Sequence, residues 1–170
     1  MQMEIERKWL IKKENIPFDL DACERMHIDQ RYVSFSPVIR IRNIDYGRKY
    51  ILTIKTAVSG IDPELAKNEY ETEITEKEYL ELMKIARGNL ISKTRFVVKA
   101  ESGLKYELDI FEGALSGLAY LEIEFPDAGS ASHFPDPDWV ECDVTYRLEY
   151  KNSALAKYGM PKTENRKGEY

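Results

Sequence analysis

The sequence predicts a mainly β protein, an antiparallel sandwich or barrel, and three observations support this. Polar and apolar residues alternate along most of the chain, with the period of two that half-buried strands show. Turn-forming residues separate several of the alternating segments, among them Ser36-Pro37, Asp45-Tyr46-Gly47 and Ser102-Gly103. Charged residues of one sign recur two positions apart, which places them on the same face of a strand.

The alternating segments define eight strands at short spacing, a number and spacing typical of all-β sandwiches and barrels. We expect them at residues 3–11, 25–34, 37–45, 49–56, 68–74, 91–100, 104–112 and 118–125. In many of these strands the face opposite the charges is apolar, as with Ile39 and Ile41 or Leu121 and Ile123. Each strand therefore has one side suited to packing against other parts of the protein.

Helices are expected at two places. Thr75 and Glu78 have the spacing of a capping box, an apolar face follows them, and Gly88 is expected to end this helix. A second helix is predicted over residues 152–158, closed by Gly159. The stretch 126–139 is rich in Pro, Asp, Ser and Gly and is expected to be a loop.

Length and charge bound the class of protein. The 170 residues fit one domain, which we place at 1–161, followed by a polar tail at 162–170. There is neither a long apolar run nor the apolar core of a signal peptide, so we expect a cytoplasmic protein without a membrane span. The net charge of −5 argues against nucleic acid or a membrane surface as a partner. The expectation of a two-fold symmetric homodimer rests only on the fact that such dimers are the commonest oligomers of soluble proteins.

The doubled like charges are the feature that carries chemistry. One strand face usually mixes signs, because neighbouring like charges repel. Acidic pairs can hold a divalent metal through oxygen ligands, and basic pairs can neutralise phosphate oxygens. A metal–polyphosphate complex requires both kinds of pair. If the strands close into a barrel with the charges inside, all of the pairs meet in one cavity. A lipocalin-like barrel for apolar ligands fits this pattern less well, because its interior would not be lined with paired charges.

These pairs also resemble a known family. Glu4-Ile5-Glu6-Arg7-Lys8 is similar to the Glu-x-Glu-x-Lys signature that opens the CYTH domain of the triphosphate tunnel metalloenzymes. Further motifs of that family follow in order: Arg40-Ile41-Arg42, Thr53-Ile54-Lys55, Glu71-Thr72-Glu73, Lys93-Thr94-Arg95, Glu107-Leu108-Asp109, Glu122-Ile123-Glu124 and the segment from Val144 to Pro161. The resemblance covers residues 3–161. It implies an eight-stranded antiparallel closed barrel with a few flanking helices, a small-molecule triphosphate substrate and Mg²⁺ or Mn²⁺.

The resemblance assigns roles to residues of this chain. The metal ligands are expected to be Glu4, Glu6, Glu122 and Glu124, with Asp109 as a further ligand. The groups expected to bind substrate phosphates are Lys8, Arg40, Arg42, Lys55, Lys93 and Arg95. Lys8 and Tyr32 are the predicted catalytic pair that positions the attacking water. Glu71 and Glu73 either hold a second metal or pair with the basic residues.

One departure from the family lies in the C-terminal segment. Members often carry an acidic and then a basic residue where this chain has Arg147 and Glu149, so the signs are exchanged. A swapped ion pair would serve the same structural purpose. We therefore assign no substrate contact to either residue.

The resemblance leaves several activities open. The first is hydrolysis of inorganic tripolyphosphate to pyrophosphate and phosphate, which the absence of an identifiable nucleobase pocket in the sequence favours. The alternatives are a class IV-type adenylate cyclase, a thiamine or nucleoside triphosphatase, and a non-catalytic polyphosphate-binding module. Such a module could lose a metal ligand, whereas every acidic motif position is filled in this chain.

Overall fold

The computed structural model describes residues 2–100 and 102–162. Its strands are β1 (Gln2–Ile11), β2 (Glu24–Phe35), β3 (Val38–Ile44), β4 (Lys49–Ala57), β5 (Ala66–Ile74), β6 (Arg87–Lys99), β7 (Lys105–Phe111), β8 (Ala119–Glu124) and β9 (Val140–Asp143). Its α-helices are α1 (Glu76–Met83), α2 (Ala128–His133) and α3 (Asn152–Tyr158). Short 3₁₀ turns lie at Lys13–Asn15, Leu20–Ala22, Asp45–Gly47, Gly113–Leu115 and Leu148–Tyr150.

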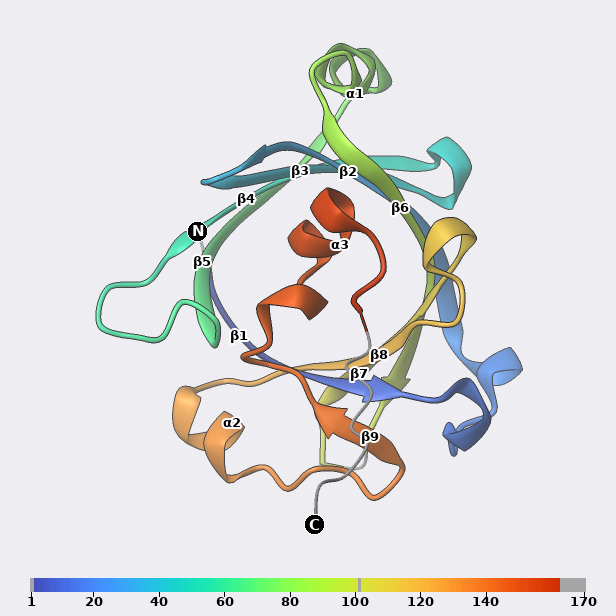
Figure 1. The fold of residues 1–170 in the computed structure, drawn as a ribbon, viewed down its shortest axis with the longest axis vertical. Helices are drawn as coiled ribbons and strands as arrows, with labels where there is room; N and C mark the ends of the chain where they lie inside the picture. Colours follow the sequence, from blue (N-terminus) through green and yellow to red (C-terminus); the bar gives the residue numbers. More distant parts are fainter. Residues whose placement is uncertain (1, 101, 163–170) are drawn as a thin grey trace.

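Strands β1 to β8 close into an antiparallel barrel, which confirms the predicted architecture. Hydrogen bonding runs in the order β5-β4-β3-β2-β6-β7-β8-β1, and β1 also pairs with β5 to complete the ring (Figure 1). Strand β1 makes both contacts with different parts of its length, residues 2–5 against β5 and residues 6–10 against β8. Strand β9 extends the sheet beyond the ring by pairing with the end of β1. Strand β9 is not among the predicted strands, because four residues are too few to show an alternation.

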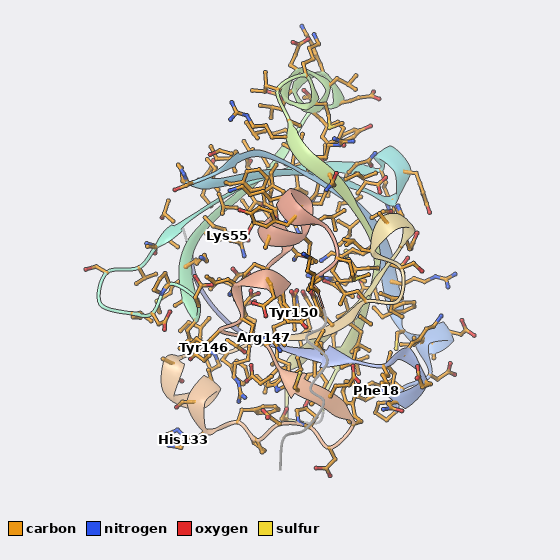
Figure 2. All side chains as sticks on the ribbon, viewed as in Figure 1. Phe18, Lys55, His133, Tyr146, Arg147 and Tyr150 are labelled. Atoms are coloured by element: carbon orange, nitrogen blue, oxygen red, sulfur yellow. The ribbon has the colours of Figure 1, made fainter. Side chains whose placement is uncertain are left out.

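The apolar faces of β1, β7 and β8 point out of the barrel and form the larger core. Trp9, Leu108 and Ile123 are fully buried there. They pack beneath α2, the segment that follows it and the turn around Phe18. Figure 2 shows Phe18 and His133 outside the ring of strands, whereas Lys55 and Tyr150 lie within it.

A second apolar cluster lies inside the barrel and closes part of it. Leu155 and Ala156 of α3 are fully buried against Tyr32, Ile91 and Tyr120 of the barrel wall. Figure 1 shows α3 within the ring of strands. The bounds of α3 agree with the predicted helix, and Gly159 ends it with a φ of 81°, in the left-handed region that glycine favours.

Helix α1 begins as predicted but ends sooner. Thr75 and Glu78 form the capping box, each side chain bonding the backbone of the other residue. The helix ends at Met83, and residues 84–86 continue with the tighter hydrogen bonds that close a helix end. Gly88 therefore does not end the helix, as predicted, but lies in β6. A Cβ there would meet the backbone oxygen of Ala156 at 2.6 Å, so the glycine allows α3 to approach β6 closely.

The stretch 126–139 is not entirely loop. Asp127 caps a short helix, α2, by accepting a hydrogen bond from the Ser130 N–H at 2.7 Å. Loop composition concealed this helix because it has only six residues. Apart from Lys162, the predicted tail lies outside the described residues. None of the described helices is long and apolar enough to cross a membrane.

Candidate functional site

The charged faces of the strands point into the barrel and surround two connected cavities. Because inward residues recur at every second position, one row of each strand contributes. The inner cavity has a volume of about 270 Å³. It is lined by Glu4, Glu6, Arg40, Arg42, Glu69, Glu71, Arg95, Lys105, Glu107, Glu122 and Glu124.

The second cavity, of about 350 Å³, forms a mouth between the barrel and α3. It shares Glu4, Glu6 and Arg40 with the inner cavity, so the two spaces adjoin at these residues. The other charged or tyrosine side chains that line it are Lys8, Tyr32, Lys55, Glu64, Lys67, Lys151, Lys157 and Tyr158. The barrel thus brings most of the predicted site residues together, although the sequence separates them by more than a hundred positions.

Carboxylates face one another across neighbouring strands in the inner cavity. Glu6 of β1 lies directly opposite Glu124 of β8, and Glu107 of β7 lies directly opposite Glu122. The pKa of Glu124 is raised, first by burial and then by the negative charge of Glu4. Like charges in opposite positions destabilise a sheet unless a cation offsets them. This arrangement fits a bound cation.

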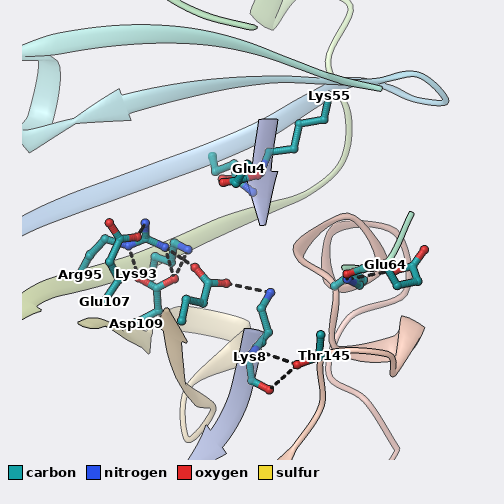
Figure 3. A network of polar contacts seen from close by, with 12 residues as sticks. Glu4, Lys8, Lys55, Glu64, Lys93, Arg95, Glu107, Asp109 and Thr145 are labelled. Carbon is teal, nitrogen blue, oxygen red and sulfur yellow. Dashed lines mark hydrogen bonds and ion pairs between the residues drawn. The ribbon is translucent and has the colours of Figure 1, made fainter. Parts of the chain in front are cut away.

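Basic side chains hold several of these carboxylates in the described structure. The Lys8 ammonium lies 2.8 Å from Glu122, and both groups are almost completely buried (Figure 3). Arg95 donates to the other oxygen of Glu122 at 2.6 Å and also bonds Glu107. Burial by itself would raise the pKa of Glu122, but the charges of Lys8 and Arg95 hold it well below its ordinary value.

Several of the carboxylates that could bind a metal are engaged in ion pairs. Among residues 2–100 and 102–162, no group of three or more His, Cys, Asp or Glu side chains is already gathered around one point as metal ligands. Glu4 instead accepts a hydrogen bond from Lys55, which also contacts Glu69 at 2.8 Å. The oxygen-only donor set suits a hard cation such as Mg²⁺ or Mn²⁺. Its binding would require these carboxylates to exchange basic partners for the ion.

Two of the arginines that line the cavities have a buried donor without a hydrogen-bond partner. The Nε–H groups of Arg40 and Arg42 are buried and have no hydrogen-bond partner among the described residues. Arg40 has only a loose contact with Glu69, at 3.7 Å, while Arg42 pairs with Glu71. Because a buried donor without an acceptor costs free energy, these guanidinium groups are suited to an anionic ligand.

Tyr32 lies in the wall of the mouth cavity with its hydroxyl held in place. Gln30, two residues earlier on the same strand, donates from Nε2 to the tyrosine oxygen at 2.8 Å. Burial raises the pKa of Tyr32, and the positive charges of Arg40, Lys55 and Lys8 oppose this shift. The tyrosine therefore keeps its proton and faces the same cavity as Lys8.

Lys93 and Asp109, two of the predicted site residues, are buried and line neither cavity. Asp109 is fully buried and accepts hydrogen bonds from Lys93 and from Arg95, the latter from Nε at 2.6 Å and from Nη2 at 2.7 Å (Figure 3). Burial alone would raise the pKa of Asp109, but these cations lower it. Glu73 lies at the rim, where its carboxylate is 3.6 Å from Lys49. The structure thus does not bring these three residues to the lining of either tunnel cavity.

The exchanged residues of the C-terminal segment pair with each other. Arg147 contacts Glu149 at 2.6 Å, and both side chains are more than two-fifths exposed. Arg147 also lies over the ring of Tyr150. Their contact is a local ion pair of the 3₁₀ turn.

Several lining residues were not among the predicted site residues. Glu69, Lys67 and Glu107 share strand faces with predicted residues, so the alternation could have identified them. Lys151, the residue directly before α3, lines the mouth and contacts Glu64 at 3.0 Å. No local pattern could have identified it, since its position depends on how α3 packs inside the barrel.

Comparisons with known proteins agree with this geometry. The chain is 32% identical to an inorganic triphosphatase of Nitrosomonas europaea over 90% of its length and 96% of that protein. It is 31% identical to an inorganic triphosphatase of Acetivibrio thermocellus, over 92% and 95% of the two chains. A crystal structure of an inorganic triphosphatase matches with a TM-score of 0.63 and 31% identity, covering 92% of this chain and 95% of that one. A separate comparison of the chain with protein-family models found no match.

Proposed function

This chain belongs to the family of the CYTH-type inorganic triphosphatases, and from this premise we propose that it hydrolyses inorganic tripolyphosphate to pyrophosphate and phosphate. The observation that supports this most strongly is the combination of opposed carboxylates and unsatisfied arginine donors around adjoining cavities. Carboxylates in excess call for a cation, and buried guanidinium donors call for an anion. A metal–triphosphate complex supplies both.

The phosphate oxygens are bound by the basic side chains of the tunnel. Arg40 and Arg42 offer their free Nε donors, and Lys55 and Arg95 supply further charge from the neighbouring walls. Arginine binds phosphate oxygens in a planar two-point contact, so these groups orient the triphosphate as well as neutralise its charge. Lys93 contributes positive charge from a buried position, where Asp109 holds it.

The metal would be held by Glu4, Glu6, Glu122 and Glu124. These four carboxylates belong to β1 and β8 and line one cavity. When Mg²⁺ or Mn²⁺ is bound, it offsets the charge on the phosphate oxygens and lowers the pKa of bound water. Glu71 lies across the same cavity and either holds a second ion or keeps its partner Arg42 in place.

Lys8 and Tyr32 position the water that attacks the terminal phosphorus. The Lys8 ammonium carries only donors, and Glu122 orients it. The tyrosine hydroxyl is oriented by Gln30 and remains protonated near neutral pH, so it can hold the water oxygen without competing for its proton. Both side chains act on the alignment of water with the leaving pyrophosphate, which is the main requirement of phosphoryl transfer.

A panel of substrates tests the proposal. Tripolyphosphate, ATP and thiamine triphosphate are each incubated with the protein and Mg²⁺ or Mn²⁺, and phosphate, pyrophosphate and cyclic AMP are measured. We expect phosphate and pyrophosphate in equal amounts from tripolyphosphate, and none when EDTA is present. Formation of cyclic AMP without release of phosphate would show that the protein is an adenylate cyclase and not a triphosphatase. Tight binding of tripolyphosphate without any product would show that it is a non-catalytic binding module.

A further inference from the structure

The charges of the tunnel are unevenly distributed along its length. In the part of the inner cavity that the mouth does not share, carboxylates predominate, with Glu69, Glu71, Glu107, Glu122 and Glu124 facing Arg42, Arg95 and Lys105. In the part lined by the mouth alone, the basic groups are Lys8, Lys55, Lys67, Lys151 and Lys157, and Glu64 is the acidic residue among the described lining. The potential therefore becomes more positive toward α3, and this end attracts anions.

Two of the mouth lysines are not engaged by carboxylates. Lys8, Lys55 and Lys151 each contact a glutamate within 3.0 Å. Lys67 and Lys157 form no ion pair with any described residue. Lys67 lies two positions before Glu69 on the inward face of β5, so its row continues the tunnel wall toward the mouth. Lys157 approaches the same cavity from α3.

The aromatic residues of the mouth distinguish between two kinds of ligand. An organic triphosphate would need a surface on which its ring could stack. The Lys157 ammonium instead lies 5.8 Å from the ring centre of Phe35 and 5.2 Å from that of Tyr158. The Phe35 ring also stacks on Tyr32, with ring centres 5.1 Å apart. The mouth thus presents a cation, positioned by aromatic rings, to whatever enters.

We propose that Lys67 and Lys157 form an additional phosphate subsite at the mouth, which binds the phosphates beyond the third in a longer linear polyphosphate. The proposal rests on the proposed function, because the first three phosphates must occupy the tunnel. The polyphosphate would enter from the α3 end, and its phosphates beyond the third would lie against Lys67 and Lys157. Tetraphosphate and longer chains then gain contacts that tripolyphosphate cannot make.

The test compares chain lengths in matched variants. Lys67→Ala, Lys157→Ala and the double variant are assayed with tripolyphosphate, tetraphosphate, a longer polyphosphate of defined length, and ATP. Lys77→Ala serves as the control, since it removes the same charge from an exposed position on α1, outside the tunnel. Binding of the same compounds in EDTA, measured by calorimetry, separates affinity from turnover.

We expect the double variant to lose about tenfold in kcat/KM and in affinity for tetraphosphate and longer chains, the effect of one or two charge-assisted contacts. Tripolyphosphate and ATP should change less than about twofold, and Lys77→Ala should leave all substrates unchanged. An equal loss for every substrate would replace the subsite by general attraction of anions. A loss confined to ATP would assign the mouth to an organic group. Because hydrolysis of tripolyphosphate is measured in the same experiment, failure of the proposed function itself would be seen separately.

Discussion

Glu6 on β1 and Glu124 on β8 occupy directly opposite positions of neighbouring strands, and both carboxylates line the inner cavity. Without a cation the pair is destabilising, so stability and activity should respond to its removal with opposite signs. We predict that Glu124→Gln raises the free energy of unfolding in EDTA by up to about 1 kcal/mol. The same variant should lower kcat/KM for tripolyphosphate by at least about 100-fold, the scale seen when charge stabilisation at a reacting group is removed.

Urea unfolding and phosphate release measure the two effects. Glu141→Gln is a suitable control, because Glu141 lies on the surface and contacts Lys12 at 3.2 Å. A Glu124→Gln protein that is less stable in EDTA and fully active would show that Glu124 is an ordinary ion-pairing residue.

Acid should destabilise the barrel through Glu122. A carboxyl group whose pKa is lower in the folded protein binds fewer protons there than in the unfolded chain, so its contribution is present above pH of about 4.3 and is lost as pH falls. For Glu122, and likewise for Asp109, the neighbouring cations cause this lowering. We predict that the free energy of unfolding drops below pH of about 4.3, by up to about 1.4 kcal/mol per pH unit for each such group.

Urea titrations between pH 7 and pH 3 follow this decline. Glu122→Gln should flatten it, and should also cost about 3–5 kcal/mol at pH 7, because Lys8 and Arg95 lose a buried partner. An unchanged slope in the variant would mean that the acid sensitivity arises elsewhere.

Tyr32→Phe should affect turnover more than binding. The substitution removes one hydroxyl and preserves the ring that stacks on Phe35. We predict that kcat falls by about 10- to 100-fold while KM for tripolyphosphate changes less than about threefold, in line with the usual contribution of a group that handles the proton of the nucleophile. Gln30→Leu should show a weaker form of the same effect, since it releases the tyrosine hydroxyl without deleting it. Wild-type turnover in Tyr32→Phe would exclude the tyrosine from the reaction.

Asp109→Asn distinguishes a metal ligand from a residue that positions Arg95. If Asp109 orients Arg95, its loss should raise KM for tripolyphosphate and leave the Mg²⁺ concentration for half-maximal activity unchanged. A metal ligand would give the reverse result. Because the variant leaves Lys93 buried beside a neutral group, we expect a loss of about 3–5 kcal/mol in stability. Adding Lys93→Met removes that charge and should restore part of the stability, so that the kinetic comparison can be made on folded protein.

The fold could be predicted from the sequence because inward and outward residues alternate regularly along the strands. The row of Glu4, Glu6 and Lys8 identifies one wall of the tunnel, and Ile5 and Trp9 on the other face of the strand identify the outer core. Alternation gives the face of a residue but not its depth. It could not show that Asp109 is fully buried away from both cavities or that Glu73 lies at the rim. It was also silent on Lys151 and Lys157, which depend on a helix folded into the interior of a barrel made by other residues.

The division of β1 between two partners has a consequence for how the chain folds. Strand β1 pairs with residues 66–69 at one end and residues 120–124 at the other. The paired residues lie far apart in the sequence, and the long loops between them must be closed before either pairing contributes stability. The ring should therefore close late and slowly, within seconds rather than microseconds. Until the ring closes, the backbone N–H and C=O groups along the edges of β1 have no partners in the sheet. Exposed strand edges of this kind promote aggregation.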